Sequence, residues 1–213
     1  MDPHADQPVS LLGPGLAASR AAMVMVHGRN AGPENILPLA EAFPHPAFSY
    51  LAPAAPGRTW YPFSFLSEIE RNEPGLSSGL RAIDRVIAQV EHAGIPRRNV
   101  ILLGFSQGAC LASEYAIRYA SRFGGLIALS GGLIGPPGTR WDYPGDFAGT
   151  PVFFGCSDLD PHVPEDRVRE SAVVFERKAA RVTLRIYPGL GHRVNEDELA
   201  FARQLVQEVA QAV

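Results

Sequence analysis

Short apolar runs alternate along the chain with longer segments in which apolar residues recur at helical spacing. The runs predict six short strands, at 21–27, 49–52, 100–103, 126–129, 152–155 and 182–187. The segments between them predict helices at 35–42, 76–90, 108–119, 166–180 and 196–213. Strands that are apolar throughout are covered by helices on both faces. The alternation therefore predicts an α/β fold on a mainly parallel, doubly wound sheet.

Length and composition favour a single globular domain. The chain has 213 residues, 46% of them hydrophobic and 19% charged, so it can bury a sizeable core. No internal repeat or change in composition marks a boundary, and we expect one domain over residues 21–213. Residues 1–20 are expected to form either a tail or an additional edge strand around Val9–Leu12.

Charge and the N-terminal sequence argue against several classes of partner. The net charge of −3 disfavours a nucleic-acid partner or a polybasic membrane patch. The first 15 residues lack the basic start and apolar core of a signal peptide, and no apolar run approaches the roughly 20 residues of a membrane helix. Cys110 and Cys156 lie in predicted apolar elements and are expected to be buried free thiols, although a disulfide stays open. We therefore expect a cytoplasmic protein without stable membrane insertion.

The strongest chemical signal is the G-x-S-x-G pattern formed by residues 104–108. It directly follows the apolar strand at 100–103 and opens the helix at 108–119, which is the setting of a nucleophile elbow. A tight turn would hold Ser106 above the sheet in a strained conformation, and the flanking glycines would leave room for neighbouring backbone. The helix N-terminus would place free N–H groups near developing negative charge. Ser106 is therefore the predicted nucleophile.

A serine nucleophile needs a base and an acid that orients the base. His192 follows the last predicted strand through a Pro-Gly-Leu-Gly loop, and Asp160 follows the strand at 152–155. Both thus lie at strand carboxyl ends, where the sites of open α/β sheets collect. We predict His192 as the base and Asp160 as the acid, with Asp158 organising the turn that Asp160 heads before the next helix. The order Ser, Asp, His is that of α/β-hydrolases.

The remaining histidines fit other roles. His162 is a weaker candidate for the base because it is so close in sequence to Asp160. His27 is expected to be a structural residue, hydrogen-bonded within its loop. His4, in the N-terminal segment, is expected at the surface, as are His45 and His92.

Two backbone N–H groups are predicted to form an oxyanion hole. One belongs to Gln107, which follows the nucleophile, and the other to Arg29, in the loop after the strand at 21–27. Only the backbone of Arg29 is used in this prediction.

With these motifs in place, the sequence resembles the phospholipase/carboxylesterase family of small serine hydrolases, which includes acyl-protein thioesterases and lysophospholipases. The resemblance rests on His27-Gly28-Arg29, Gly104-Phe105-Ser106-Gln107-Gly108, Asp160-Pro161-His162-Val163-Pro164 and Gly191-His192. It covers nearly the whole chain and implies Ser106, Asp160 and His192 as nucleophile, acid and base. It also implies an α/β-hydrolase fold with no cap domain. His27-Gly28-Arg29-Asn30 stands where eukaryotic thioesterases have a Gly/Asp-rich stretch, so the chain looks more like the bacterial carboxylesterase branch.

Two long loops are predicted to supply the walls of an apolar substrate pocket. Loops of this kind also cover cores, and the sequence leaves that alternative open. The candidate wall residues are Trp60, Tyr61, Phe63 and Phe65 from the first loop and Leu133, Ile134 and Trp141 from the second.

The expected function is hydrolysis of short- to medium-chain acyl esters through an acyl-enzyme, because no extended apolar lid helix is visible. No metal or organic cofactor is expected, and the expected partner is a small ester, with a homodimer left open. A lysophospholipase or an acyl thioesterase is the first alternative. A non-catalytic binding protein on a hydrolase fold is a remote one, since a binder has no need to keep all three of Ser106, Asp160 and His192.

Overall fold

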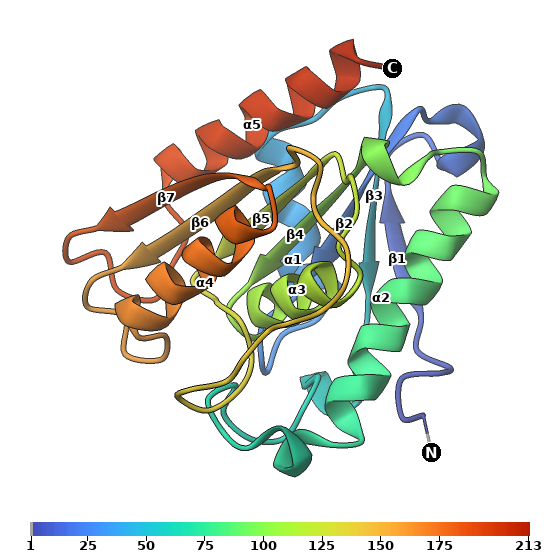
Figure 1. Cartoon of the computed structure of the whole chain (residues 1–213). Helices are drawn as coiled ribbons and strands as arrows, with labels where there is room; N and C mark the ends of the chain where they lie inside the picture. Colours follow the sequence, from blue (N-terminus) through green and yellow to red (C-terminus); the bar gives the residue numbers. More distant parts are fainter. Residues whose placement is uncertain (1) are drawn as a thin grey trace.

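The computed structural model describes residues 2–213, and Met1 lies outside the described residues. In these residues seven strands form one sheet in the order β1-β3-β2-β4-β5-β6-β7 (Figure 1). All neighbours are parallel except β1 and β3, which are antiparallel. The strands are β1 (Val9–Leu12), β2 (Ala21–Val26), β3 (Phe48–Pro53), β4 (Val100–Phe105), β5 (Gly125–Leu129), β6 (Pro151–Ser157) and β7 (Arg181–Tyr187). The mainly parallel sheet predicted from the sequence is confirmed.

Helices cover both faces of this sheet, as Figure 1 shows. On one face lie α2 (Gly75–His92), α3 (Gln107–Arg118) and α4 (Glu165–Arg177). On the other lie α1 (Pro33–Ile36) and α5 (Glu196–Gln211). The helix expected over 35–42 is instead a single turn of α-helix followed by a 3₁₀ helix at Leu37–Ala42. Pro38 lies in the first turn of this second helix, where its missing N–H leaves no hydrogen bond unmade.

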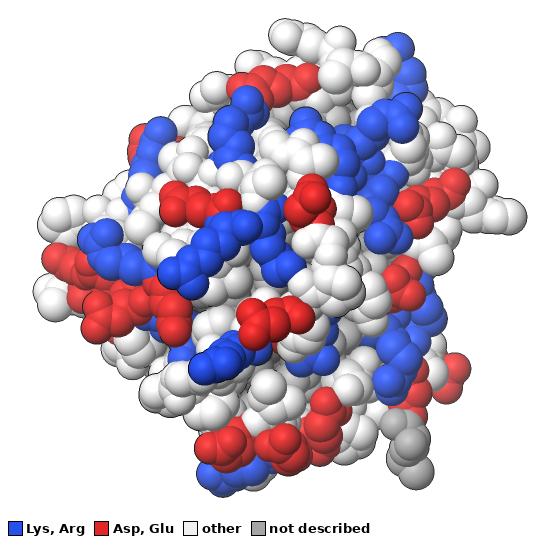
Figure 2. All heavy atoms as spheres, viewed as in Figure 1, with Lys and Arg blue, Asp and Glu red and all other residues white. Residues whose placement is uncertain are grey.

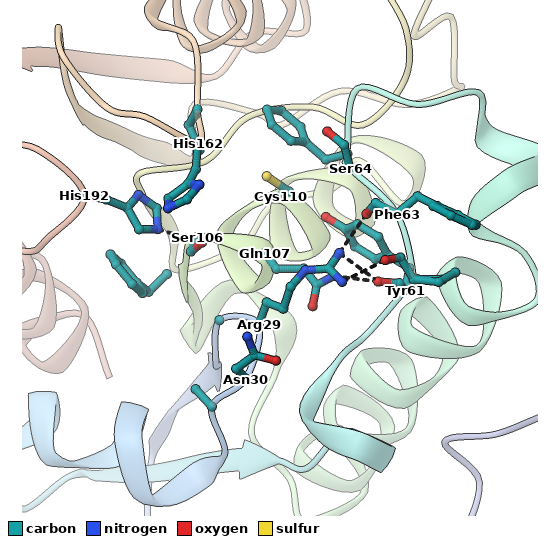
Figure 3. A pocket seen from close by; sticks show the side chains of 16 residues that line it. Arg29, Asn30, Tyr61, Phe63, Ser64, Ser106, Gln107, Cys110, His162 and His192 are labelled. Atoms are coloured by element: carbon teal, nitrogen blue, oxygen red, sulfur yellow. Dashed lines mark hydrogen bonds between the residues drawn. The ribbon is translucent and has the colours of Figure 1, made fainter.

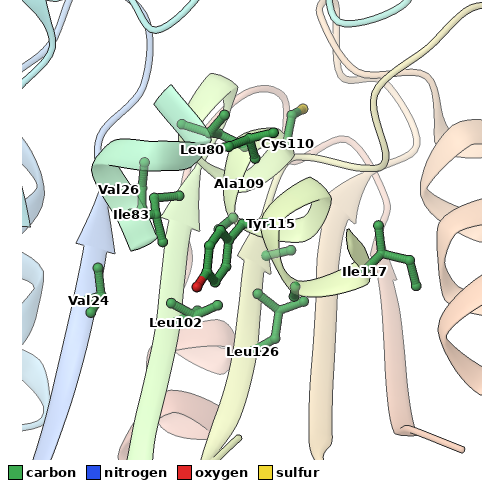
Figure 4. Close-up of a cluster of buried hydrophobic side chains, with 14 of the residues drawn as sticks. Val24, Val26, Leu80, Ile83, Leu102, Ala109, Cys110, Tyr115, Ile117 and Leu126 are labelled. Carbon is green, nitrogen blue, oxygen red and sulfur yellow. The ribbon is translucent and has the colours of Figure 1, made fainter. Parts of the chain in front are cut away.

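Alternating side chains on the central strands build two separate cores. Val24, Leu102 and Leu126 are neighbours in the register of β2, β4 and β5 and face α3, where Tyr115 packs on them (Figure 4). Residues one step away along the same strands, such as Ile101, belong to the core under α1 and α5. Because both faces are buried, every position of the central strands must be apolar, which explains their unbroken hydrophobic runs.

The N-terminal segment packs more closely on the domain than its sequence indicated. Val9–Leu12 forms the edge strand β1, paired with β3. His4, expected at the surface, is only 2% exposed: its Nδ1 lies 2.8 Å from the Ser78 hydroxyl, and its ring stacks on Trp60 at 5.3 Å. The polar sequence around His4 gave no sign of this burial, because the partners come from α2 and from a distant loop.

The surface carries mixed charge. On the face formed by α2, α3 and α4, acidic and basic side chains are interspersed (Figure 2). No helix within residues 2–213 is long and apolar enough to cross a membrane.

Candidate active site

Ser106 lies on a strained turn between β4 and α3. Its backbone has φ 56° and ψ −122°, a conformation that costs a non-glycine residue on the order of 1–3 kcal/mol. The flanking glycines make the turn sterically feasible. A Cβ on Gly104 would lie 2.4 Å from the Gly108 carbonyl oxygen, and one on Gly108 would lie 2.1 Å from that of Val26. The spacing of the G-x-S-x-G pattern is thus a packing requirement of this strand–turn–helix unit.

A continuous hydrogen-bonded series joins Ser106, His192 and Asp160. His192 Nε2 lies 2.8 Å from Ser106 Oγ, and His192 Nδ1 lies 2.7 Å from Asp160 Oδ2. The serine follows β4, the aspartate follows β6 and the histidine follows β7. Because parallel strands end at the same edge of the sheet, residues 86 and 32 positions apart meet there.

Asp160 is held as a carboxylate. Its side chain is fully buried, and its Oδ1 accepts backbone hydrogen bonds from His162 (2.9 Å) and Val163 (3.0 Å). Burial raises the pKa of Asp160, but the hydrogen bond to His192 and these two N–H groups outweigh burial and leave the pKa below its usual value. An ionised Asp160 accepts a hydrogen bond from the Nδ1–H of His192, which keeps the proton on Nδ1 and leaves Nε2 free to accept from Ser106.

The loop that carries His192 is fastened to the end of β6. Asp158 Oδ1 accepts from the Gly189 N–H at 2.8 Å, and the Ser157 hydroxyl accepts from the Gly191 N–H at 2.9 Å. Asp158 therefore binds the loop that carries His192, rather than the turn after Asp160 that the sequence suggested, whose N–H groups donate to Asp160 itself. The part played by Ser157 could not be foreseen, because it lies 34 residues from its partner.

The two predicted oxyanion donors flank Ser106. Gln107 opens α3, so its N–H has no helical acceptor, and Arg29 follows Gly28, where an added Cβ would lie 3.3 Å from Ser106 Cβ. Among the described residues, neither the Arg29 nor the Gln107 N–H donates to a protein acceptor. Both residues line the cavity in front of Ser106.

That cavity has a volume of about 470 Å³, and both His192 and Ser106 line it (Figure 3). Three of the predicted wall residues, Tyr61, Phe63 and Phe65, line it. Lining residues that the sequence did not single out for the pocket include Asn30, Ala31, Cys110, His162 and Val163. Only their position at strand ends or one turn after the nucleophile could have pointed to them. The Cys110 and Cys156 thiols are both buried and unpaired, as expected.

The prediction is wrong for the other four wall residues, which do not line this cavity: Trp60, Leu133, Ile134 and Trp141. Trp60 is fully buried behind the loop, where its indole Nε1 donates to the His27 carbonyl oxygen at 2.8 Å. Leu133 and Ile134 are also fully buried, in the core beneath α3 and α4. The Trp141 indole donates to the Ile134 carbonyl at 3.0 Å, so it packs against its own loop.

Two further histidines approach the site in different ways. His27 is buried, and its Nδ1 donates to the Gly28 carbonyl oxygen at 2.8 Å, which is a structural contact. The His162 ring stands edge-on to His192, with centroids 4.8 Å apart. The structure pairs Ser106 with His192 rather than with His162.

A mainly parallel α/β sheet with a serine on a strained turn, hydrogen-bonded to a histidine and an aspartate from later strand ends, defines the class of α/β-hydrolases. The chain belongs to the phospholipase/carboxylesterase family, whose model matches residues 17–210. The resemblance drawn from the sequence and the fold expected from it are confirmed.

Similar proteins include both a thioesterase and a probable carboxylesterase. Acyl-protein thioesterase 1 of Saccharomyces cerevisiae is 31% identical over 128 residues, which make up 59% of this chain and 56% of the yeast protein. A probable carboxylesterase of Oryza sativa subsp. japonica is 26% identical over 202 residues, 86% of this chain and 75% of the rice protein. The chain thus spans little more than half the length of the yeast relative.

Solved structures match over nearly the whole chain. The crystal structure of a phospholipase/carboxylesterase from Dyadobacter fermentans has a TM-score of 0.92 at 37% identity, covering 97% of this chain and 99% of that one. The Bacillus cereus carboxylesterase has a TM-score of 0.77 at 20% identity, covering 96% and 95%, which is a likeness of fold alone.

Proposed function

We propose that the protein is a serine carboxylesterase that hydrolyses short- to medium-chain acyl esters through an acyl-enzyme. The observation that carries this proposal is the hydrogen-bonded series from Ser106 Oγ through His192 to the buried Asp160 carboxylate. Its geometry suits proton transfer from the serine to His192 Nε2 as the serine attacks an ester carbonyl.

Each step of the proposed reaction has a group to serve it. The Arg29 and Gln107 N–H groups stabilise the oxyanion of the tetrahedral intermediate. The imidazolium of His192, supported by Asp160, gives its proton to the departing alcohol. Water then attacks the acyl group on Ser106, with His192 again as base. The proposed reaction uses no metal or organic cofactor.

The cavity supports the assignment of substrate size. A volume of about 470 Å³ with aromatic walls suits an apolar acyl group, and it lies in the lower part of the usual range for small-molecule sites. Phe63, which lines this cavity, is 45% exposed to solvent.

A thioesterase is the second candidate, supported by the yeast relative that is named an acyl-protein thioesterase. The same serine and oxyanion donors would serve a thioester. A pair of substrates with one acyl group, joined once to an oxygen and once to a sulfur leaving group, separates the two candidates by their kcat/KM. We also retain the cytoplasm as the proposed location, since buried free thiols suit a reducing compartment.

The test is the Ser106→Ala variant, assayed with p-nitrophenyl esters of increasing acyl length. We expect kcat to fall by about 10⁶, with an unchanged circular dichroism spectrum. The matched control is Ser113→Ala, in the helix that follows Ser106, which removes a buried hydroxyl with no hydrogen-bond partner among residues 2–213 and should retain activity. A fluorophosphonate adduct on Ser106 supports the proposal. Wild-type turnover by Ser106→Ala would refute it.

A further inference from the structure

The side chain of Arg29 binds the loop that forms the aromatic wall of the cavity. Its guanidinium donates to the carbonyl oxygens of three successive residues: to Tyr61 at 3.0 Å, to Pro62 at 2.8 Å and to Phe63 at 2.7 Å (Figure 3). A planar, forked donor can satisfy several carbonyls at once, whereas a lysine ammonium acts as a single point. Arg29 thus has its proposed oxyanion donor, the backbone N–H, beside Ser106, while its side chain binds the loop of the aromatic wall.

Gln107 makes the matching connection from the other side of Ser106. Its Nε2 donates to the Tyr61 carbonyl at 2.8 Å, and its Oε1 accepts from the Trp60 N–H at 3.0 Å and from the Thr59 hydroxyl at 3.3 Å. The side chains of the two proposed oxyanion residues therefore hold the same segment, 59–63, through six hydrogen bonds.

The two residues differ in how their own N–H groups are held. Gln107 is the first residue of the 12-residue helix α3, so its backbone is fixed without its side chain. Arg29 lies in the loop after β2, next to Asn30 with φ 61°. The nearest backbone bonds of this loop are Asn30 N–H to the Arg58 carbonyl (2.8 Å) and Ala31 N–H to the Gly28 carbonyl (3.3 Å). The orientation of the Arg29 N–H therefore depends more on its side chain than the orientation of the Gln107 N–H does.

We propose that Arg29 is a positioning residue that couples the aromatic wall to the oxyanion hole. Its guanidinium, anchored on the carbonyls of residues 61–63, holds its own N–H at the oxyanion position. A substrate acyl group that packs well against the wall would thereby also settle its carbonyl against a correctly placed donor. This inference rests on the proposed hydrolytic function and adds to it a role for a side chain.

The coupling predicts different kinetic effects for the two residues. Arg29→Ala should lower kcat by about 10- to 100-fold, part of the loss that follows removal of a whole oxyanion donor. Gln107→Ala should mainly raise KM, because its N–H stays fixed by α3 while the wall loosens. Arg29→Lys should stay closer to Arg29→Ala than to wild type, since one ammonium cannot span three carbonyls.

The experiment measures kcat and KM of these variants with one ester series, together with the affinity for a trifluoromethyl ketone, which forms an oxyanion on the serine. The control is Arg58→Ala, which removes the same charge from the neighbouring exposed ion pair with Glu34 and should change kcat less than twofold. Guanidinium ions, kept far below denaturing concentrations, should restore part of the kcat of Arg29→Ala. Ketone affinity should fall in parallel with kcat/KM.

The inference fails if Arg29→Ala keeps kcat within twofold of Arg58→Ala, or if Arg29→Lys, which retains the charge, restores full kcat. It fails equally if guanidinium restores nothing while the circular dichroism of Arg29→Ala matches the wild type. An inactive Ser106→Ala beside an unaffected Arg29→Ala would refute this inference alone, whereas an active Ser106→Ala would refute the function on which it rests.

Discussion

Two long loops share a content of proline and aromatic residues but differ in position. The loop between β3 and α2 and the loop between β5 and β6 both carry several prolines and aromatic side chains. The first places Tyr61, Phe63 and Phe65 in the cavity at Ser106, whereas the second places its large apolar side chains in the core. Composition therefore does not decide which loop lines the cavity.

The polar partners of each loop backbone make the difference. The first loop is bound by the side chains of Arg29 and Gln107, which flank Ser106. The second is bound by groups inside the helical layer: buried Glu114 accepts from the Ile134 N–H at 3.2 Å, and Arg167 donates to the carbonyls of Leu133 (2.9 Å) and Gly135 (2.6 Å). The backbone groups of the two loops are thus paired by different parts of the fold.

The largest effect is expected from Trp141→Ala in the second loop. Trp141 is 5% exposed and packs beneath the Arg167 guanidinium, which lies 5.3 Å from its ring. Its loss should lower the free energy of unfolding by about 3–5 kcal/mol, measured by urea denaturation, with KM of the folded enzyme unchanged. A raised KM without loss of stability would instead place Trp141 in substrate binding. The proposed difference in role between the two loops would then be wrong.

The contrast between the loops also separates the features that could be predicted from the sequence from those that could not. Strand positions and the strand–turn–helix unit at Ser106 depend on local periodicity and on glycines close in sequence, so both could be predicted. Asp160 and His192 could be proposed because parallel strands end at one edge of the sheet. The side on which Trp60 and Trp141 would pack could not be predicted, because it depends on hydrogen bonds to His27 and Ile134 in the folded loops.

A second test uses pH to weaken the packing of His4 against Trp60 of the first loop. Burial lowers the pKa of His4, which stacks on Trp60, to about 4, and the nearby charges of Asp2, Arg81 and Arg85 adjust that value. Between pH 6.5 and 4 the unfolded chain binds a proton that the folded chain excludes, so stability falls as the pH is lowered, by at most about 3 kcal/mol.

His4→Asn can still donate to Ser78 but does not titrate, so its unfolding free energy should depend less on pH in this window. Denaturant titrations at several pH values measure the difference. Equal pH dependence in both proteins would show that His4 does not support the loop in this way. Titration of Glu114, which anchors the second loop, should change the free energy of unfolding in the opposite direction. Burial raises the pKa of Glu114, so the folded chain keeps a proton that the unfolded chain releases, and stability is lost as the pH rises through the folded pKa.

The smallest effect is expected from Phe63→Ala at the cavity rim. With 45% of its surface exposed, Phe63 contributes little to the core, so the free energy of unfolding should change by less than about 1 kcal/mol. KM for apolar esters should rise by roughly fivefold, because acyl contact area is lost. Steady-state kinetics over several acyl lengths measure this change. An unaltered KM at every length would remove the first loop from substrate recognition.

The sheet order has a consequence for how the protein acquires activity. Ser106 follows a central strand, but His192 follows β7, which pairs only with β6 at the far edge. The series Ser106–His192–Asp160 is therefore complete only when β7 has paired with β6, whichever strands pair first. During refolding from denaturant, ester hydrolysis should not return before this edge of the sheet has formed, so the regain of activity reports on the assembly of that edge.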